Sequence, residues 1–121
     1  MIIEKKEDIE FFNRLLKLPA TGKEQDWAVE MSDPSRVREF IQTYTNGQFT
    51  VEQRQALMSL ILASYEELLY KNEENNIWKD IKQLLLTDKI LFKDIINHWA
   101  LWNESQPEQL FKISPLIREI G

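Results

Sequence analysis

Few residues of this 121-residue sequence could carry out acid–base or covalent chemistry. The chain has a single histidine, His98, and no cysteine. Asp94 precedes His98 by four residues, so both side chains can share one helix face and could begin a metal site. Such a site needs three or four ligands, and no other His or Cys is present to complete it. We expect no metal or other cofactor, and an enzyme centred on His98 is the least favoured hypothesis.

Two pairs of adjacent carboxylates resemble acid–base couples in their letters: Glu66 with Glu67, and Glu73 with Glu74. Neighbouring residues of a helix point about 100° apart, so neither pair can converge on one substrate. The three glycines are far apart in the sequence, which excludes a glycine-rich phosphate loop. No nucleophile elbow or zinc-protease motif occurs. These observations predict a protein without catalytic activity.

Acidic residues gather in two parts of the chain, whose formal net charge is −5. Residues 23–33 contain four acidic residues and one lysine, and residues 50–75 contain five glutamates and two basic residues. An acidic surface repels nucleic acid and anionic membranes, so we expect neither as a partner. It attracts basic proteins, which makes a basic protein partner the favoured hypothesis. The alternative is that these carboxylates only solvate helix faces.

The sequence contains four tryptophans, and Trp27 is the one placed among acidic residues. A tryptophan surrounded by carboxylates is typical of an anchor in a protein interface. Trp27 could equally pin a loose connection to the core, because tryptophan is usually mostly buried. The predicted partner-binding residues are Glu24, Asp26, Trp27, Glu30, Glu66, Glu67, Glu73 and Glu74.

Composition predicts one folded domain that covers residues 1–121. Hydrophobic residues make up 43% of the chain and charged residues 29%, as in ordinary globular proteins. No apolar run approaches the roughly 18 residues that a membrane span needs. The acidic N-terminus lacks the basic and apolar regions of a signal peptide, and cysteine is absent. We therefore expect a cytoplasmic protein.

Apolar residues recur with helical rather than strand periodicity, which predicts an all-α fold. We expect an irregular bundle of about five main helices, with a long connection after the first. In that connection Trp27, Val29 and Met31 alternate with other residues, which favours an extended segment or a short strand. The helices are predicted at residues 4–18, 34–46, 51–71, 78–87 and 91–102, with a last helical turn or two at 115–120.

Several residues mark where these helices begin and end. Asp33 is a predicted N-cap before Pro34, and Thr50 with Gln53 forms a predicted capping box. Gly47 is a predicted left-handed cap after the second helix. The helix at 51–71 is apolar over a wide arc, so we expect it at the centre of the bundle.

Residues 18–22, LPATG, match the letters of the signal that sortases cleave. That signal works near a C-terminus, before an apolar span and a basic tail, on an exported protein. Here it lies near the N-terminus and precedes KEQDWAVEMSDP. We interpret these letters as the end of the first helix, stopped by Pro19, and a turn at Gly22.

The stretch LPATGKEQDWAVEMSDPSRVREFI, followed by LMSLILASYEELL, resembles a group of small cytoplasmic bacterial proteins of mostly helical structure. In size, acidity, lack of cysteine and tryptophan content, the chain is also similar to immunity proteins of polymorphic-toxin and contact-dependent inhibition systems. The resemblance in letters covers about residues 15–70. It implies a binding protein that neutralises a cognate toxin, for which a basic toxin domain would be the partner.

A second hypothesis is an adaptor or structural subunit of a bacterial assembly. Such a protein would use an apolar helix face and would form a stable oligomer. The sequence leaves the oligomeric state open.

Overall fold

The computed structural model describes residues 5–71 and 76–120. Within these ranges every regular element is a helix or a 3-10 turn and there is no strand, which confirms the predicted all-α class. Five helices have eight or more residues: α1 (Lys6–Leu15), α3 (Val37–Asn46), α4 (Val51–Tyr70), α5 (Trp78–Thr87) and α6 (Lys93–Ala100). Shorter elements are α2 (Trp27–Glu30), α7 (Ser114–Arg118) and the 3-10 turns η1 (Pro34–Arg36) and η2 (Pro107–Gln109).

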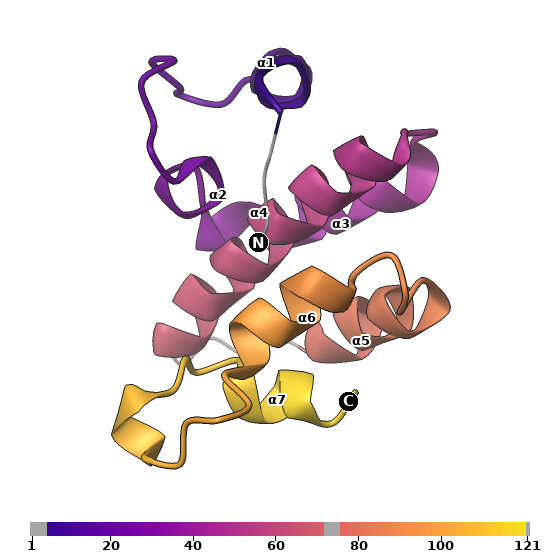
Figure 1. The fold of residues 1–121 in the computed structure, drawn as a ribbon. Coiled ribbons are helices and arrows are strands. Elements are labelled where there is room, and N and C mark those ends of the chain that lie inside the picture. The colour runs from indigo at the N-terminus through magenta and orange to yellow at the C-terminus, as the bar shows by residue number, and fades with distance from the viewer. Residues whose placement is uncertain (1–4, 72–75, 121) are drawn as a thin grey trace.

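Helix α4 forms the centre of the bundle. Every residue from 56 to 66 is buried, including the small polar side chains of Ser59 and Ser64. A helix that is buried on all sides must be covered by other elements all round. Helices α1 to α3 lie on one side of α4, and α5 to α7 lie on the other (Figure 1).

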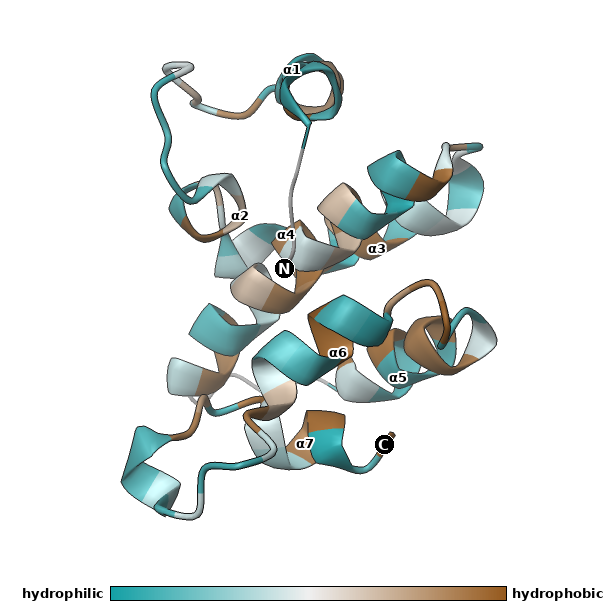
Figure 2. Ribbon diagram, in the orientation of Figure 1, coloured by the Kyte–Doolittle hydropathy of each residue, from teal (hydrophilic) through white to brown (hydrophobic). Residues whose placement is uncertain are grey.

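One hydrophobic core joins the two layers through α4. It contains Phe12 and Phe40 from the first layer and Phe92 and Ile117 from the second, all essentially inaccessible to solvent. In Figure 2, hydrophobic residues recur along α4, whereas hydrophilic residues cover the outward surface of α6. Among the described residues, none of the helices combines the length and the apolar composition that a membrane crossing needs.

Helix α1 ends at Leu15, three residues earlier than predicted. Lys17 adopts a left-handed conformation with a φ of 54°. The N–H of Leu18 donates to the carbonyl of Asn13 at 3.0 Å, and the N–H of Lys17 donates to Arg14 at 3.4 Å. These two bonds form a Schellman motif, which satisfies the last carbonyls of the helix. The motif, rather than Pro19, therefore ends α1.

The connection contains a helical turn, α2, where we predicted an extended segment or a strand. The N–H of Glu30 donates to Asp26 at 2.9 Å, and that of Met31 donates to Trp27 at 2.8 Å. Trp27, Ala28 and Met31 are buried, whereas Val29 is exposed. Burial at positions i, i+1 and i+4 has the helical period. The prediction of an extended segment, which was based on the alternation of apolar residues, is therefore wrong.

The predicted helix starts at Asp33 and Thr50 are confirmed. Asp33 accepts a hydrogen bond from the N–H of Ser35 at 3.0 Å, although the element it caps begins as the 3-10 turn η1. The side chain and backbone of Thr50 exchange hydrogen bonds with those of Gln53, as in a capping box. Gly47 follows α3 but is extended rather than left-handed. A Cβ there would overlap the Phe49 ring, so any other residue at this position would require that ring to shift.

Candidate protein-binding surface

The turn that leads into α2 is organised by Glu24. Its carboxylate accepts hydrogen bonds from the N–H and hydroxyl of Thr21, at 2.7 and 2.8 Å, and from the N–H of Gly22 at 3.2 Å. Gly22 has a φ of 87°, which confirms the predicted turn. The bonds from Thr21 and then Gly22 favour the charged form and lower the pKa of Glu24. Glu24 therefore stays ionised and shapes the turn.

Asp26, Val29 and Glu30 present the outer side of α2 to solvent. The carboxylate of Glu30 accepts a hydrogen bond from the N–H of Asp26 at 2.8 Å, which closes the start of the helical turn. Val29, the residue before Glu30, is 49% exposed. In the predicted extended segment, Val29 would lie on the same side as Trp27 and Met31. If residues 27–31 are instead given the helical period, Trp27 and Met31 share the buried side and Val29 faces solvent.

Trp27 is 2% exposed and belongs to the core, so it is not a surface anchor in this structure. Its indole N–H donates to the side-chain oxygen of Asn13 on α1 at 2.8 Å. The Trp27 and Phe12 rings have centroids 6.4 Å apart. These contacts agree with the other interpretation of Trp27, in which the ring pins the connection to the bundle.

Glu67 is brought next to this connection although it lies on α4. The hydroxyl of Ser32 donates to the Glu67 carboxylate at 2.5 Å, and the N–H of Asp33 donates to the Ser64 hydroxyl at 3.0 Å. Both bonds join the end of α2 to α4. We group the residues of the turn and of the outer side of α2 with Glu67, which Ser32 joins to the end of α2, and name the group the α2 acidic surface: Glu24, Asp26, Val29, Glu30 and Glu67.

Glu66 lies elsewhere and has a structural role. It is 7% exposed, and its carboxylate accepts hydrogen bonds from the N–H groups of Lys112 and Ile113 at 2.9 and 2.8 Å. These bonds hold the chain just before α7. Burial raises the pKa of Glu66, and the two backbone hydrogen bonds oppose that rise. Its predicted role in partner binding therefore does not fit its position.

Glu73 and Glu74, the last two predicted contacts, lie outside the described residues. His98 is exposed on α6, with its ring centroid 5.4 Å from that of Trp99 and 6.0 Å from that of Phe111. Among residues 5–71 and 76–120, no three His, Asp or Glu side chains are grouped as metal ligands would be.

The comparisons with protein-family models, with curated proteins and with solved structures found no match to this chain. The resemblance to immunity proteins therefore stays a prediction. The chemistry of the described surface is the remaining guide to what the chain binds.

Proposed function

We propose that this chain is a non-catalytic protein-binding module that inhibits a basic protein through the α2 acidic surface. The observation that carries the proposal is the hydrogen bond between Ser32 and Glu67. It joins Glu67 of α4 to the end of α2, two residues after Glu30, although α2 and Glu67 are far apart in the sequence. The surface thereby combines clustered negative charge with an exposed apolar side chain, Val29.

This combination suits a basic partner. Asp26 and Glu30 are exposed, so their charges steer an approaching cationic surface without first being desolvated. Val29, which is exposed next to Glu30 on α2, offers a small apolar contact. Surface carboxylates of this kind act mainly on the association rate, which falls as salt screens the charges.

Within this proposal, the inhibited protein is a bacterial toxin, as in the immunity systems that the sequence resembles. A cationic toxin domain that acts on nucleic acid carries a positive surface, because it must bind phosphates. An acidic inhibitor can cover that surface and compete with the substrate.

The test compares two double variants of equal charge change. Asp26→Lys with Glu30→Lys alters the α2 acidic surface, whereas Asp80→Lys with Asp94→Lys alters exposed acids on α5 and α6. The tagged wild-type chain is used to purify its partner from the organism that encodes it, and the partner is then expressed with each variant. We expect a basic partner that arrests growth when expressed alone.

The wild type and the α5–α6 variant should restore growth, and the α2 variant should not. Association with the α2 variant should be slower by about tenfold at low salt, with a smaller difference at high salt. Equal rescue by both variants would overturn the assignment of this surface. A partner without toxicity would overturn the inhibitory role.

The adaptor hypothesis is favoured by a different observation, which is the exposure of large apolar side chains. Ile90 is 91% exposed and Tyr70 is 62% exposed. An adaptor that uses them would form an obligate assembly, because stable monomers rarely expose large apolar patches. Size-exclusion chromatography with light scattering separates the two functions: a monomer supports the inhibitor, and a stable oligomer supports the adaptor.

A further inference from the structure

A shallow groove lies at the turn between α5 and α6, away from α2. Its volume is about 290 Å³. We name it the Ile90 groove, and it is lined by Lys89, Ile90, Lys93, Ile96, Asn97 and Trp102. Five of these residues come from the turn and from α6, and Trp102 comes from the segment after α6.

Ile90 is the most exposed large apolar residue among the described ones, yet the turn that carries it is firmly held. On one side of it Asp88 forms a 2.8 Å ion pair with Arg54 of α4. On the other side the Gln55 side chain donates to the carbonyl of Leu91 at 3.0 Å. Two contacts from α4 therefore fix both flanks, and the exposure of Ile90 is part of the folded arrangement.

Trp102 is also held in place at the surface. Its indole N–H donates to the side-chain oxygen of Asn97 at 2.9 Å, and the ring is 44% exposed. The preceding residue, Leu101, has a left-handed φ of 48°. The Arg118 guanidinium donates to the carbonyls of Leu101 and Glu104, which fastens the chain on both sides of Trp102. Exposed aromatic rings that are fixed in this way are typical binding anchors.

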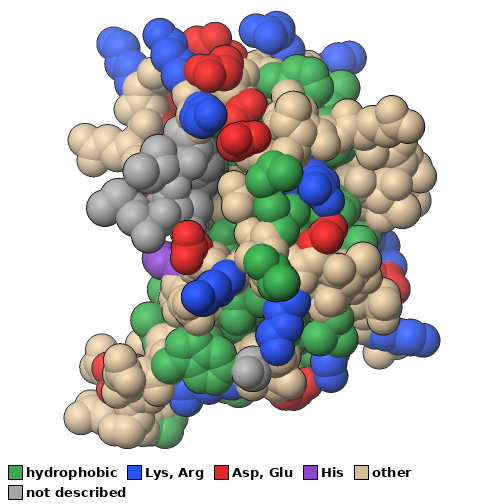
Figure 3. Space-filling view, turned by 45° about the vertical axis from the view of Figure 1, so that its right-hand side comes forward, with side chains coloured by type: hydrophobic (Ala, Val, Ile, Leu, Met, Phe, Trp, Pro, Cys, Tyr) green, Lys and Arg blue, Asp and Glu red, His purple; other side chains and the backbone are tan. Residues whose placement is uncertain are grey.

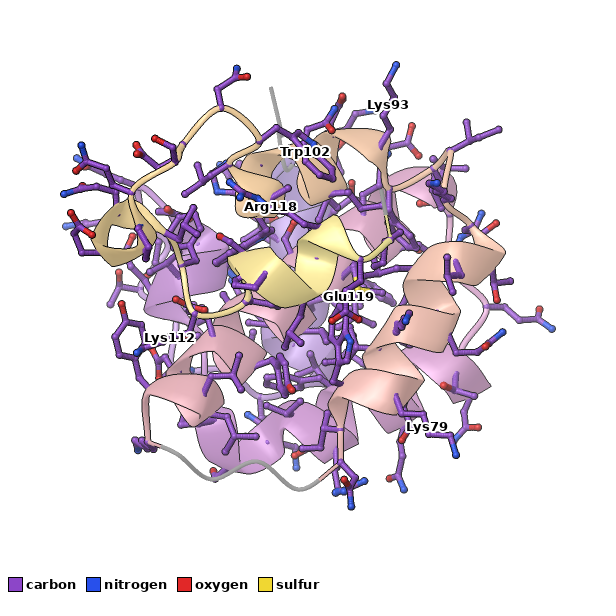
Figure 4. All side chains as sticks on the ribbon, turned by 90° about the horizontal axis from the view of Figure 1, so that it is seen from below. Lys79, Lys93, Trp102, Lys112, Arg118 and Glu119 are labelled. Atoms are coloured by element: carbon purple, nitrogen blue, oxygen red, sulfur yellow. The ribbon has the colours of Figure 1, made fainter. Side chains whose placement is uncertain are left out.

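The charge around the groove is positive. Lys89 and Lys93 are exposed, and within residues 5–71 and 76–120 neither forms an ion pair. Asp88 is occupied by Arg54, and the nearest other acid along α6 is Asp94, which does not line the groove. Figure 4 shows Lys93 and Trp102 at the same edge of the molecule.

The negative charge of the chain is also unevenly distributed along the sequence. Residues 1–75 contain fourteen acidic and nine basic residues, whereas residues 76–121 contain six of each. On the face in Figure 3, Lys and Arg side chains lie among hydrophobic ones and a few acidic ones over the lower half, which holds α5 to α7. The excess of negative charge therefore lies in the first part of the chain, whereas the Ile90 groove is lined by two lysines and by no acidic residue.

We infer that the Ile90 groove binds an acidic polypeptide segment that presents one apolar side chain between carboxylates. The apolar side chain would pack between Ile90 and Trp102, and the carboxylates would reach Lys89 and Lys93. The hollow between the two anchors fits an inserted side chain better than a membrane surface, which would favour a convex group of anchors. This binding is independent of the proposed inhibition of a basic protein.

The test uses three synthetic twelve-residue peptides and the full-length ¹⁵N-labelled chain. The first peptide has one Phe among Asp and Glu residues, the second has Lys in place of every acid, and the third has Ser in place of Phe. Backbone resonances and the Trp102 indole N–H, assigned with Trp102→Phe, are followed during titration. We expect the first peptide to shift Ile90, Lys93 and Trp102, and the other two to shift them far less.

Two variants and two matched controls locate the binding. Ile90→Ser and the double variant Lys89→Glu with Lys93→Glu should each weaken binding of the first peptide by about tenfold or more at low salt. Leu86→Ser removes another exposed apolar side chain, on α5, and Lys23→Glu with Lys79→Glu makes the same charge change elsewhere. Both controls should bind as the wild type does. Circular dichroism confirms that each variant is folded.

Three outcomes would overturn the inference. Equal shifts with the basic peptide, or shifts spread over all lysines, would show that the groove does not recognise the acidic segment. Shifts of the groove resonances on dilution of the protein alone would assign the groove to a second copy. Binding to vesicles with one-fifth phosphatidylserine, with no response to the acidic peptide, would assign it to a membrane.

Discussion

Neighbouring glutamates on α4 show how burial separates the roles of individual residues. The Glu66 carboxylate is buried against the chain before α7, where two N–H groups donate to it. The Glu67 carboxylate is partly exposed and accepts from Ser32. The side chains point about 100° apart on the helix, so one faces the second layer and the other faces the connection.

At the residue scale, stability should depend on pH through Glu66. The pKa of Glu66 is raised in the folded state, so the folded protein favours the protonated side chain. The stabilisation that this gives is fully present below the ordinary pKa of Glu, and it is lost as the pH rises through the folded-state pKa. The free energy of unfolding of the wild type, relative to that of Glu66→Gln, should therefore increase as the pH is lowered from 7 towards 4.5. Urea unfolding of both proteins across this range measures it.

Glu67→Gln is the matched control for this prediction, because it makes the same chemical change at the adjacent, more exposed position. A difference for Glu66→Gln that stays constant, or that decreases as the pH falls, would contradict the assigned shift.

A second prediction at this scale compares Trp27 with Trp102, because the first is buried and the second is exposed. Trp27→Ala removes a buried ring and its hydrogen bond to Asn13, and should destabilise the fold by about 3–5 kcal/mol. Trp102→Ala removes a half-exposed ring and should cost about 1 kcal/mol or less. Chemical denaturation of the two variants measures both values, and similar losses would show that the burial assignment is wrong.

At the scale of elements, helix ends depend on a few backbone positions. Helices α1 and α6 both end near a left-handed residue that is not glycine, Lys17 after α1 and Leu101 after α6. At Leu101 the strain is offset by the guanidinium of Arg118, which also donates to Ala100 at 2.8 Å. Lys17 lies in an exposed Schellman motif, where glycine is the usual residue.

Lys17→Gly should therefore stabilise the protein. Removing the Cβ relieves a left-handed strain of about 1–2 kcal/mol, and the greater freedom of glycine in the unfolded chain offsets part of that gain. We expect a net increase of about 0.5–1 kcal/mol in the free energy of unfolding. Lys17→Ala removes the same charge but keeps the Cβ, so it should not stabilise. An equal effect of both variants would assign the gain to charge instead.

At the scale of the whole molecule, α4 links two layers into one core. Arg54, Gln55 and Glu66 reach from α4 to the second layer, and the first layer packs directly on the same helix. Neither layer can keep its core face buried without α4, so the chain should unfold as one unit.

Ile61→Ala tests this cooperativity, because Ile61 lies at the middle of α4 with no exposed surface. We expect a loss of about 2–5 kcal/mol in the free energy of unfolding. Hydrogen exchange should show that the amides of α3 and of α6 lose protection to a similar extent. Loss of protection in one layer alone, or two separate unfolding transitions, would show that the chain is not a single cooperative domain.

Much of the helical framework could be predicted from local patterns. Thr50 and Gln53 form a capping box from side chains three residues apart, and Asp33 before Pro34 starts η1. The wide apolar arc of α4 required burial on all sides, and the structure has it. These features depend on residues that are close to one another in the sequence, so the residue types were sufficient to predict them.

The sequence by itself thus determined the all-α class, the central helix and the acidic balance of the chain. The tertiary structure decided which of the charged and aromatic residues face solvent, because that depends on contacts between residues far apart in the chain. The buried Trp27 donates a hydrogen bond to Asn13, and the chain before α7 covers Glu66 and donates to it. Ser32 joins Glu67 to the connection through a further hydrogen bond. Contacts from α4 likewise leave Ile90 exposed, and periodicity along one helix could indicate none of these distant neighbours.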